Sequence, residues 1–398
     1  DHLPKTQKYL PKQRLWYIRA NEVLISSGSI ERPLVFGNND TPGVMLSSAA
    51  KEYMKVYGVL VGKKPLIFTN NDSGYETAIE FKKNGVNPII LDTRSNPSSD
   101  IITEAKNLNI GIKFSYVVVA AKGYKKVKSA DIAKISDDKK ELFNIENIKC
   151  DCICVSGFWT PSIHLASQSG NKSKFNEKID AFVPDKSKQQ ENTIGSANGI
   201  FTLEETIKDA FDKGFDVSNK ITEKNNKVSV PTVVEKKSTD HDKFWCVPLP
   251  KGKSYKRFLD FQNDVAVSDI ELALREGFRS IEHVKRYTTL GMATDQGKTS
   301  NLNGLQLVSD IENKVVPQVG HTTFRPPYTP VSIGAIVGRE VGKHSKPTRK
   351  SPMHSWHEKN NAVFVDAGVW LRPRYYKQGN EGLFEASKRE AKNVRQNV

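Results

Sequence analysis

The residues best suited to bind a metal ion or to carry redox chemistry are the four cysteines, and their spacing argues against both roles. Cys150, Cys152 and Cys154 alternate in KCDCICVSG, which is the period of a β-strand, and Cys246 lies far away in the sequence. Residues in a row along a strand do not converge on one ion. His354 and His357 form a similarly incomplete pair, because no cysteine or carboxylate at zinc-site spacing accompanies them. We therefore expect reduced, structural cysteines and no metal site.

Two turns that follow strands have features of nucleotide sites. The S-G-S turn at Gly28 allows close approach of the backbone to a cofactor, because glycine has no Cβ, although an ordinary strand-to-loop glycine explains it as well. The second turn, within residues 68–74, has one glycine where a G-x-G-x-x-G turn would place phosphate on a helix N-terminus. Asp72 in this turn would repel a pyrophosphate, although Asp92 keeps the position of a ribose-binding acid. The second turn therefore predicts a vestigial nucleotide site.

Two further segments combine small and polar residues. The loop RYTTLGMATDQGKTSNLNG carries Arg286 and Lys298 beside backbone N–H groups, and such a surface suits a phosphate or a subunit contact. Polar residues that merely cap the loop are the alternative. In IGSANGIFTLEETIKDAF a turn of small residues, 195–199, precedes an amphipathic helix. These small residues fit either a nucleotide or close helix–strand packing.

The elements that position these turns alternate between strands and helices up to about residue 199. A helical period covers residues 48–57, and KPLIFTNNDSGYETAIEFKKNGVNPIILDTR reads as a strand–turn–helix–strand unit. Strands are predicted at residues 15–19, 23–26, 66–68 and 88–91, and within GIKFSYVVVAAKGY and CDCICVSGF. This alternation predicts an α/β fold with a parallel sheet that has helices on its faces.

The second half of the sequence differs in character. Residues 220–252 are charged and lack a period, so they are expected to form a linker or an extended crossing segment. Helices are predicted at residues 267–277 and 280–287. The proline-rich stretch TTFRPPYTPVSIG should be extended, because each proline disfavours helix at the residue before it.

Length and composition limit the class of protein. With 398 residues and 37% hydrophobic content, the chain is expected to be globular with two or three domains. The net charge of +15 arises from lysines spread over the surface rather than from a basic stripe with aromatics, so nucleic-acid binding is not expected. No apolar run reaches the length of about 18 residues that spans a membrane. The chain begins at Asp1 and ends in a Lys/Arg-rich stretch, so we expect an internal piece of a longer polypeptide.

The segment from Phe258 to Gly304 resembles the 2Fe–2S module of several amine-oxidising flavoenzymes, whose pattern is C-x-C-E-E-V-T, a helix, and G-M-x-x-C-Q-G-x-x-C. The four cysteine positions are held here by Asp260, Gln262, Asp295 and Ser300. A cluster needs thiolates or, less often, imidazoles, so this copy cannot hold one. A module with these substitutions resembles the alpha subunits of heterotetrameric sarcosine oxidase.

The same family is matched on both sides of the module. GSIERPLVFGNNDTPGVMLSSAA and SGFWTPSIHLASQSG resemble its disulfide-reductase-like FAD/NAD(P)-binding fold with parallel sheets. TFRPPYTPVSIGAIVGRE and SPMHSWHEKNNAVFVDAGVWLRPRYY resemble the start of an aminomethyltransferase-like folate domain. The resemblance implies a dinucleotide-binding domain in residues 1–219, which lacks its N-terminal part and includes a vestigial second fold at about 58–150. It further implies the linker at 220–252, a helical module without a cluster at 253–320, and the truncated folate domain at 321–398.

The resemblance also implies cofactors and site residues. Gly28, Ala197, Thr202 and Leu203 are carried over as contacts of a non-catalytic NAD, whereas His164 is expected to be a packed histidine. FMN lies at the interface with the beta subunit, FAD lies in that partner, and the tetrahydrofolate site lies beyond residue 398. The family implies beta, gamma and delta subunits, a small-molecule substrate, a cytoplasmic location, and no contact with membrane or nucleic acid. No residue of this chain is expected to act as a catalytic acid, base or nucleophile, and no metal is expected.

The implied reaction is the oxidative demethylation of sarcosine to glycine. It yields hydrogen peroxide and either formaldehyde or 5,10-methylenetetrahydrofolate. Two alternatives stay open. One is the alpha subunit of a related dehydrogenase of dimethylglycine, proline or an opine. The other is a non-catalytic scaffold subunit whose nucleotide sites have decayed.

Overall fold

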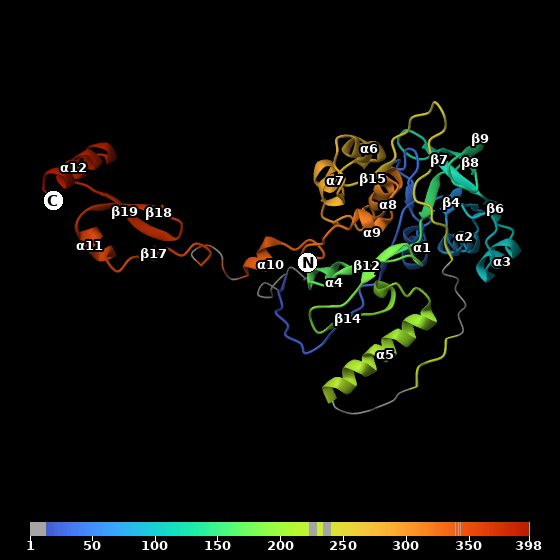
Figure 1. Cartoon of the computed structure of the whole chain (residues 1–398), viewed down its shortest axis with the longest axis horizontal. Helices are drawn as coiled ribbons and strands as arrows, with labels where there is room; N and C mark the ends of the chain where they lie inside the picture. Colours follow the sequence, from blue (N-terminus) through green and yellow to red (C-terminus); the bar gives the residue numbers. More distant parts are fainter. Residues whose placement is uncertain are drawn as a thin grey trace. The chain divides into compact units, whose positions relative to one another are not determined.

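The computed structural model describes residues 13–222, 229–233, 240–338, 340, 342 and 344–397. These residues form two units, which are described separately. The large unit runs from Ala20 to Thr329, and the small unit holds the described residues up to Arg19 together with those from Pro330 onward. Nearly all the elements drawn around the central sheet in Figure 1 belong to the large unit.

A five-stranded parallel sheet forms the centre of the large unit. Its inner strands β10 and β4 are buried along their whole length, as expected of a parallel sheet covered on both sides. The strands, in spatial order, are β3 (Val44–Leu46), β10 (Cys152–Ser156), β4 (Pro65–Thr69), β5 (Ile89–Asp92) and β6 (Gly111–Phe114). The parallel sheet and the strands predicted at 66–68 and 88–91 are confirmed, each within about a residue.

Helices cover one face of this sheet. Ile67, Ile90, Cys152 and Cys154 point to that face and form one apolar cluster with buried residues of the helices. The helices are α1 (Ser47–Tyr57), α2 (Ser73–Lys83) and α3 (Asp100–Asn107). Cys152 and Cys154 are therefore buried core residues in reduced form, as their strand spacing predicted.

An antiparallel sheet covers the other face. Its residues pack against Leu66, Phe68 and Val155 of the central sheet. Its strands are β7 (Tyr116–Lys122), β8 (Ser129–Ile135) and β9 (Leu142–Lys149), in that order. The sequence predicted β7 but not β8 or β9, and β9 is largely exposed although half of its residues are apolar.

Short elements close the nucleotide-fold region. Strand β1 (Val23–Ile25) pairs in parallel with β14 (Glu191–Thr193), and the 3₁₀ turn η1 and helix α5 follow β14. The remaining elements here are β2 (Ser29–Glu31), β11 (Trp159–Pro161), α4 (His164–Gln168), β12 (Ser173–Asn176), β13 (Ala181–Pro184), η1 (Gly195–Asn198) and α5 (Leu203–Thr222). No described side chain of α5 is buried, and in Figure 1 this long helix stands away from the central sheet.

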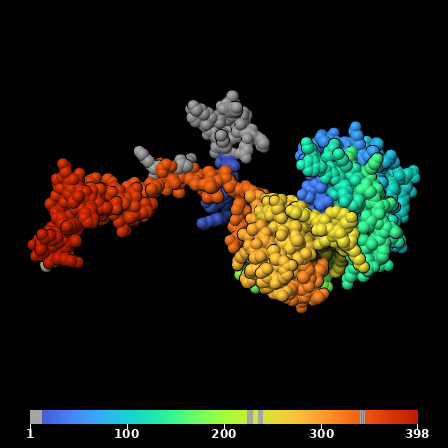
Figure 2. Space-filling model, turned by 90° about the horizontal axis from the view of Figure 1, so that it is seen from above, coloured from blue at the N-terminus to red at the C-terminus, as the bar shows by residue number. Residues whose placement is uncertain are grey.

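The helical module completes the large unit. Its two predicted helices are confirmed. Its hydrophobic core also includes Phe182 of β13 and Ile163, the residue before α4. The elements are β15 (Phe258–Asp260), β16 (Val265–Ala266), α6 (Val267–Arg275), α7 (Ile281–Thr288), α8 (Asn301–Glu312) and α9 (Val316–Val319). Figure 2 shows the module, in yellow to orange, packed directly beside the blue-to-green nucleotide fold. One hydrophobic core therefore joins the two parts of the large unit.

Residues 240–252 run in extended form across the large unit. Cys246 makes an isolated parallel bridge with Val35, and His241 makes an antiparallel bridge with Asn71. Phe244 and Val247 are buried in the cluster between the two sheets. This part of the charged segment is thus an extended crossing segment that contributes to the core.

The small unit contains a three-stranded sheet and short helices. Strand β19 lies between β17 and β18, and α12 contacts β19. The elements are α10 (Ile333–Val337), β17 (Arg349–Lys350), α11 (His354–Lys359), β18 (Ala362–Ala367), β19 (Trp370–Tyr376) and α12 (Leu383–Gln396).

The strand predicted at residues 15–19 is wrong. These residues form no strand, and Trp16, Tyr17 and Ile18 are exposed. Alternation of side chains identifies a segment that suits a sheet, but a strand also needs a neighbour to pair with, and the described part of the chain provides none here. Among the described helices, none combines the length and the apolar character needed to cross a membrane.

Candidate functional site

The first predicted nucleotide turn lies at the end of the β1–β14 pair. Gly28 has φ +74°, a conformation that glycine adopts without strain. Its carbonyl accepts a hydrogen bond from the Ser162 N–H (2.9 Å), and the Ser27 hydroxyl donates to the Ser162 carbonyl (2.8 Å). A Cβ at Gly28 would meet only the Ser196 Oγ, 3.9 Å away. The structure therefore brings the Gly28 turn next to η1, with open space beside it.

The η1 turn is held by a buried residue of its own and by a hydrogen bond to α5. Ala197 is fully buried, and Gly195 donates its N–H to Asp209 of α5 (2.8 Å). Gly199 has φ +81°, and a Cβ there would lie 2.7 Å from the Ile179 Cδ1, so only glycine fits. Gly28 and Ala197, predicted separately from sequence, thus lie on neighbouring turns.

The other two predicted contacts start helix α5. The Thr202 hydroxyl donates to the Glu205 carboxylate (2.7 Å) and accepts from the Glu205 N–H (3.3 Å), which is a helix-capping arrangement. Leu203 is exposed. The Thr202 hydroxyl is thus already engaged within the chain, so a nucleotide at this place would have to contact backbone or the Leu203 side chain.

The second predicted turn is occupied by its own side chains. Asn70 and Asn71 are buried, and their amides bond to the backbone of the crossing segment and of β10. The Ser73 N–H at the start of α2 donates to the Asn71 Oδ1 (2.8 Å), so a side chain already holds the position that a phosphate oxygen would take. A Cβ at Gly74 would lie 2.6 Å from the Thr69 Cβ, so the single glycine serves close packing of α2 on β4.

An ion-pair network fills the ribose side of this fold. Asp92, at the end of β5, has no exposed surface and accepts bonds from Arg94 (Nη2 to Oδ2, 2.9 Å) and from the Tyr75 hydroxyl (2.7 Å). The same Arg94 nitrogen donates to Asp72 (2.8 Å). Asp92, the acid that would bind a ribose, is therefore already hydrogen-bonded within the chain. Asp72, which was predicted to repel phosphate, is paired with Arg94.

The charges of this network favour permanent ion pairing. Burial lowers the pKa of Arg94, but its bonds to Asp92 and Asp72 outweigh burial and leave the pKa raised. Burial and the Asp92 charge raise the pKa of Tyr75, so it remains a donor. Lys139 pairs with Asp242 of the crossing segment at the rim (2.9 Å). The residues present do not fit a dinucleotide, and the vestigial interpretation agrees with this geometry.

In the helical module, Asp260 stands where the first cysteine of a cluster would be. It is 3% exposed, and its carboxylate accepts three backbone N–H groups, from Gln262 (2.9 Å), Asn263 (3.2 Å) and Gly291 (2.7 Å). These bonds tie the start of the module to the loop after α7. A carboxylate of this kind organises the loop through hydrogen bonds alone.

The other three replaced positions also lack ligand character. The Gln262 oxygen accepts from the Thr294 hydroxyl (3.1 Å), and Asp295 accepts from the Gly297 N–H (3.2 Å). Ser300 is buried, and its hydroxyl has no hydrogen-bond partner among the described residues. The Asn301 amide fills the space between two loop glycines, since a Cβ at Gly291 or Gly297 would lie about 2 Å from its Oδ1. Among the described residues, no group of three or more His, Cys, Asp or Glu side chains could hold a metal ion. The residues at these positions do not fit an iron–sulfur cluster.

The two basic residues of the module loop are placed apart. Arg286 pairs with Glu282 on α7 (3.8 Å). Lys298 donates to the Tyr328 carbonyl (2.9 Å), lies 4.4 Å from the centre of its ring, and lines a small cavity together with His164. His164 is buried, as the sequence predicted, against the Phe324 ring at 3.8 Å. The sequence did not identify the cavity, because its walls come from segments more than a hundred residues apart.

The chain is similar to curated alpha subunits of sarcosine oxidase along its whole length. It is 37% identical over 404 residues to the sarcosine oxidase alpha subunit of Rhizobium meliloti (strain 1021). The alignment covers 100% of this chain and 39% of the relative. It is 33% identical over 396 residues to the sarcosine oxidase alpha subunit of Corynebacterium sp. (strain P-1). The alignment covers 97% of this chain and 40% of the relative. The chain therefore spans about 40% of the length of these relatives.

Residues 254–339 match the family described as the sarcosine oxidase A3 domain. A crystal structure of L-proline dehydrogenase from P. horikoshii matches 80% of this chain and 58% of its own chain, with a TM-score of 0.52 and 22% identity. At this identity the match concerns the fold alone, including its parallel sheet.

Proposed function

Since this chain is related over its whole length to the alpha subunits of sarcosine oxidase, we propose that it works as part of such a subunit in the oxidative demethylation of sarcosine to glycine. The observation that carries the proposal is the 33–37% identity over at least 97% of the chain. In the complete enzyme the beta subunit oxidises the substrate with FAD. Electrons pass through FMN to oxygen, and the one-carbon unit leaves as formaldehyde or 5,10-methylenetetrahydrofolate.

The region of Gly28 and η1 is proposed to hold a non-catalytic NAD, with contacts from Gly28, Ala197, Thr202 and Leu203. Two features support this. The turns at Gly28 and Ala197 are adjacent and leave open space beside Gly28. The pair β1–β14 is a two-stranded parallel sheet, and α5 has no buried side chain among its described residues, whereas parallel sheets are normally extensive and covered. Both fit a place within a larger dinucleotide domain.

The second dinucleotide fold and the module are proposed to be structural. The Asn71 and Arg94 contacts close the former, and Asp260 and Asn301 replace the cluster of the latter. Electron transfer in the proposed enzyme therefore bypasses this chain's module and uses FMN at the interface with the beta subunit, which the module loop is proposed to face. The small unit is proposed to begin the folate domain. Gamma and delta subunits complete the proposed cytoplasmic assembly.

Two other functions make different predictions. A scaffold subunit with decayed sites is supported by the second fold, where Arg94 pairs with Asp72 and Asp92. A dehydrogenase of dimethylglycine, proline or an opine would share the fold, as the match to L-proline dehydrogenase illustrates.

The test is the substrate profile of the full-length protein assembled with its partner subunits. We expect oxygen uptake and hydrogen peroxide with sarcosine, at a kcat/KM well above that for dimethylglycine or proline. Oxidation of dimethylglycine or proline in preference to sarcosine would replace the proposal with the sister dehydrogenase. Absence of NAD from the purified full-length alpha chain would favour the scaffold function.

A further inference from the structure

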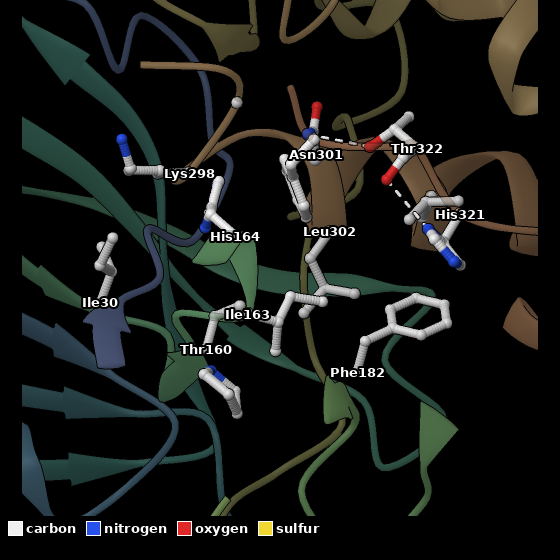
Figure 3. A pocket seen from close by; sticks show the side chains of 14 residues that line it. Ile30, Thr160, Ile163, His164, Phe182, Lys298, Asn301, Leu302, His321 and Thr322 are labelled. Atoms are coloured by element: carbon white, nitrogen blue, oxygen red, sulfur yellow. Dashed lines mark hydrogen bonds between the residues drawn. The ribbon is translucent and has the colours of Figure 1, made fainter. Parts of the chain in front are cut away.

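A small cavity lies where α4 and β11 meet the helical module (Figure 3). It measures about 40 Å³. Because one buried water needs roughly 10–15 Å³, this space fits about three water-sized atoms. Its walls are mainly apolar, from residues such as Ile163, Phe182 and Leu302, and a few polar groups converge on them.

His164 is the first polar group without a partner. The side chain is 3% exposed, and neither ring nitrogen has a hydrogen-bond partner among the described residues. Burial and, to a smaller degree, the Lys298 charge lower its pKa to about 4. The imidazole is therefore neutral at pH 7, with one N–H donor and one acceptor nitrogen. A buried imidazole left unpaired costs free energy, which a ligand at this place would recover.

Two more donors line the same space. The Thr160 hydroxyl is buried and has no partner among the described residues. Lys298 uses one donor on the Tyr328 carbonyl and forms no ion pair with any described carboxylate. No Asp or Glu is among the described residues of the cavity wall. The wall thus includes one lysine, whose ammonium bonds to the Tyr328 carbonyl, and two polar side chains without a partner, and none of its described residues is a carboxylate.

The remaining polar wall residues are Asn301, His321 and Thr322. The His321 Nδ1 bonds to the Thr322 carbonyl (2.9 Å). The Asn301 amide nitrogen donates to the Thr322 hydroxyl (3.1 Å), and its oxygen lies against Gly291 and Gly297. In Figure 3 that oxygen points away from His164. The cavity wall therefore presents mainly donors to its interior.

We propose that this cavity is a binding site for a small monovalent carboxylate of the size of formate, held by Lys298, His164 and Thr160. The ammonium supplies the countercharge, and the imidazole N–H and the hydroxyl donate to the carboxylate oxygens. Formate has three heavy atoms, which matches this volume. The apolar walls exclude competing water and strengthen these bonds.

The test is thermal unfolding of the full-length protein in sodium formate, with sodium chloride at equal ionic strength as the reference. A ligand that binds only the folded state stabilises it in a saturable manner. We expect saturable stabilisation by formate, with a fitted affinity at least tenfold weaker in Lys298→Met. The matched control is Lys285→Met on α7, a lysine outside the cavity wall, for which the affinity should stay within about twofold of the parent.

Two further variants keep the test decisive if Lys298→Met folds poorly. Lys298→Arg retains the charge and should retain binding, whereas Thr160→Val keeps the shape of the side chain and should weaken formate binding several-fold. The proposal is overturned if formate gives no more stabilisation than chloride. It is equally overturned if Thr160→Val and Lys298→Met bind formate as tightly as the parent, since the effect would then arise elsewhere.

Discussion

Replacing Asp260 by alanine should loosen the whole loop between β15 and α8. The carboxylate accepts three backbone N–H groups, two on one oxygen and one on the other. A hydrogen bond to a charged group contributes about 1.5–3 kcal/mol, and the two bonds that share an oxygen count as little more than one. We therefore expect Asp260→Ala to destabilise the module by about 3–5 kcal/mol.

The matched control is Asp295→Ala at another of the four replaced cysteine positions. Asp295 is only half-buried, and its carboxylate accepts one long bond, from the Gly297 N–H at 3.2 Å. Its loss should cost about 0.5–1 kcal/mol. Asp260→Asn keeps an acceptor oxygen and loses the charge, so its effect should fall between the two.

Amide hydrogen exchange measures this loop directly, because it reports local opening. In Asp260→Ala, the peptide amides of residues 262, 263 and 291 should exchange roughly 100-fold to 4,000-fold faster, since each 1.4 kcal/mol is a factor of ten. Exchange in the central sheet should be unchanged. If Asp260→Ala and Asp295→Ala give equal exchange rates at these amides, the carboxylate does not organise the loop and the reasoning fails.

Three other outcomes follow from buried groups. Arg94→Met leaves the fully buried Asp92 without its cation, so the urea midpoint should fall by the equivalent of about 3–5 kcal/mol. Adding Asp92→Asn should restore part of the lost stability. An unchanged midpoint in Arg94→Met would contradict the ion-pair network. The pKa of His164, about 4 when folded against about 6.5 when unfolded, means that only the unfolded chain takes up the proton between these values. The parent should therefore lose about 3 kcal/mol of stability as the pH falls from 6.5 to 4 relative to His164→Gln, and parallel pH profiles of the two would refute this. Gly199→Ala should cost about 1–3 kcal/mol of stability, because Gly199 has a positive φ and the new Cβ would lie 2.7 Å from the Ile179 Cδ1. In the control Gly214→Ala, the new Cβ in α5 meets nothing within 4 Å, so the change should be neutral or stabilising. Equal melting temperatures of the two variants would count against the packing of η1.

The central sheet was predictable because its signal is local. The strand–turn–helix–strand unit of β4, α2 and β5 has apolar runs and a helical period within some thirty residues, and each element was found close to its predicted position. Helices α6 and α7 of the module were predicted for the same reason.

Features that depend on distant partners were not predictable in this way. Residues 15–19 alternate like a strand but pair with no described strand, whereas the largely exposed β9 forms because β8 lies beside it. Asp72 was read as a charge that repels phosphate, but Arg94 from the next strand's end pairs with it. The cysteine substitutions, in contrast, were visible in the sequence, although the three bonds of Asp260 required the structure.

The central claim is that the region of Gly28 and Ala197 belongs to a domain that holds NAD while the second dinucleotide fold of the chain is closed. The most direct measurement is the identity and amount of nucleotide released on denaturing the purified full-length protein, by mass spectrometry. The account predicts about one NAD per alpha chain. Because Arg94 lies in the second dinucleotide fold, which is closed, the amount of NAD should be unchanged in Arg94→Met. Absence of NAD from the parent, or loss of NAD in Arg94→Met with the fold intact, would contradict it.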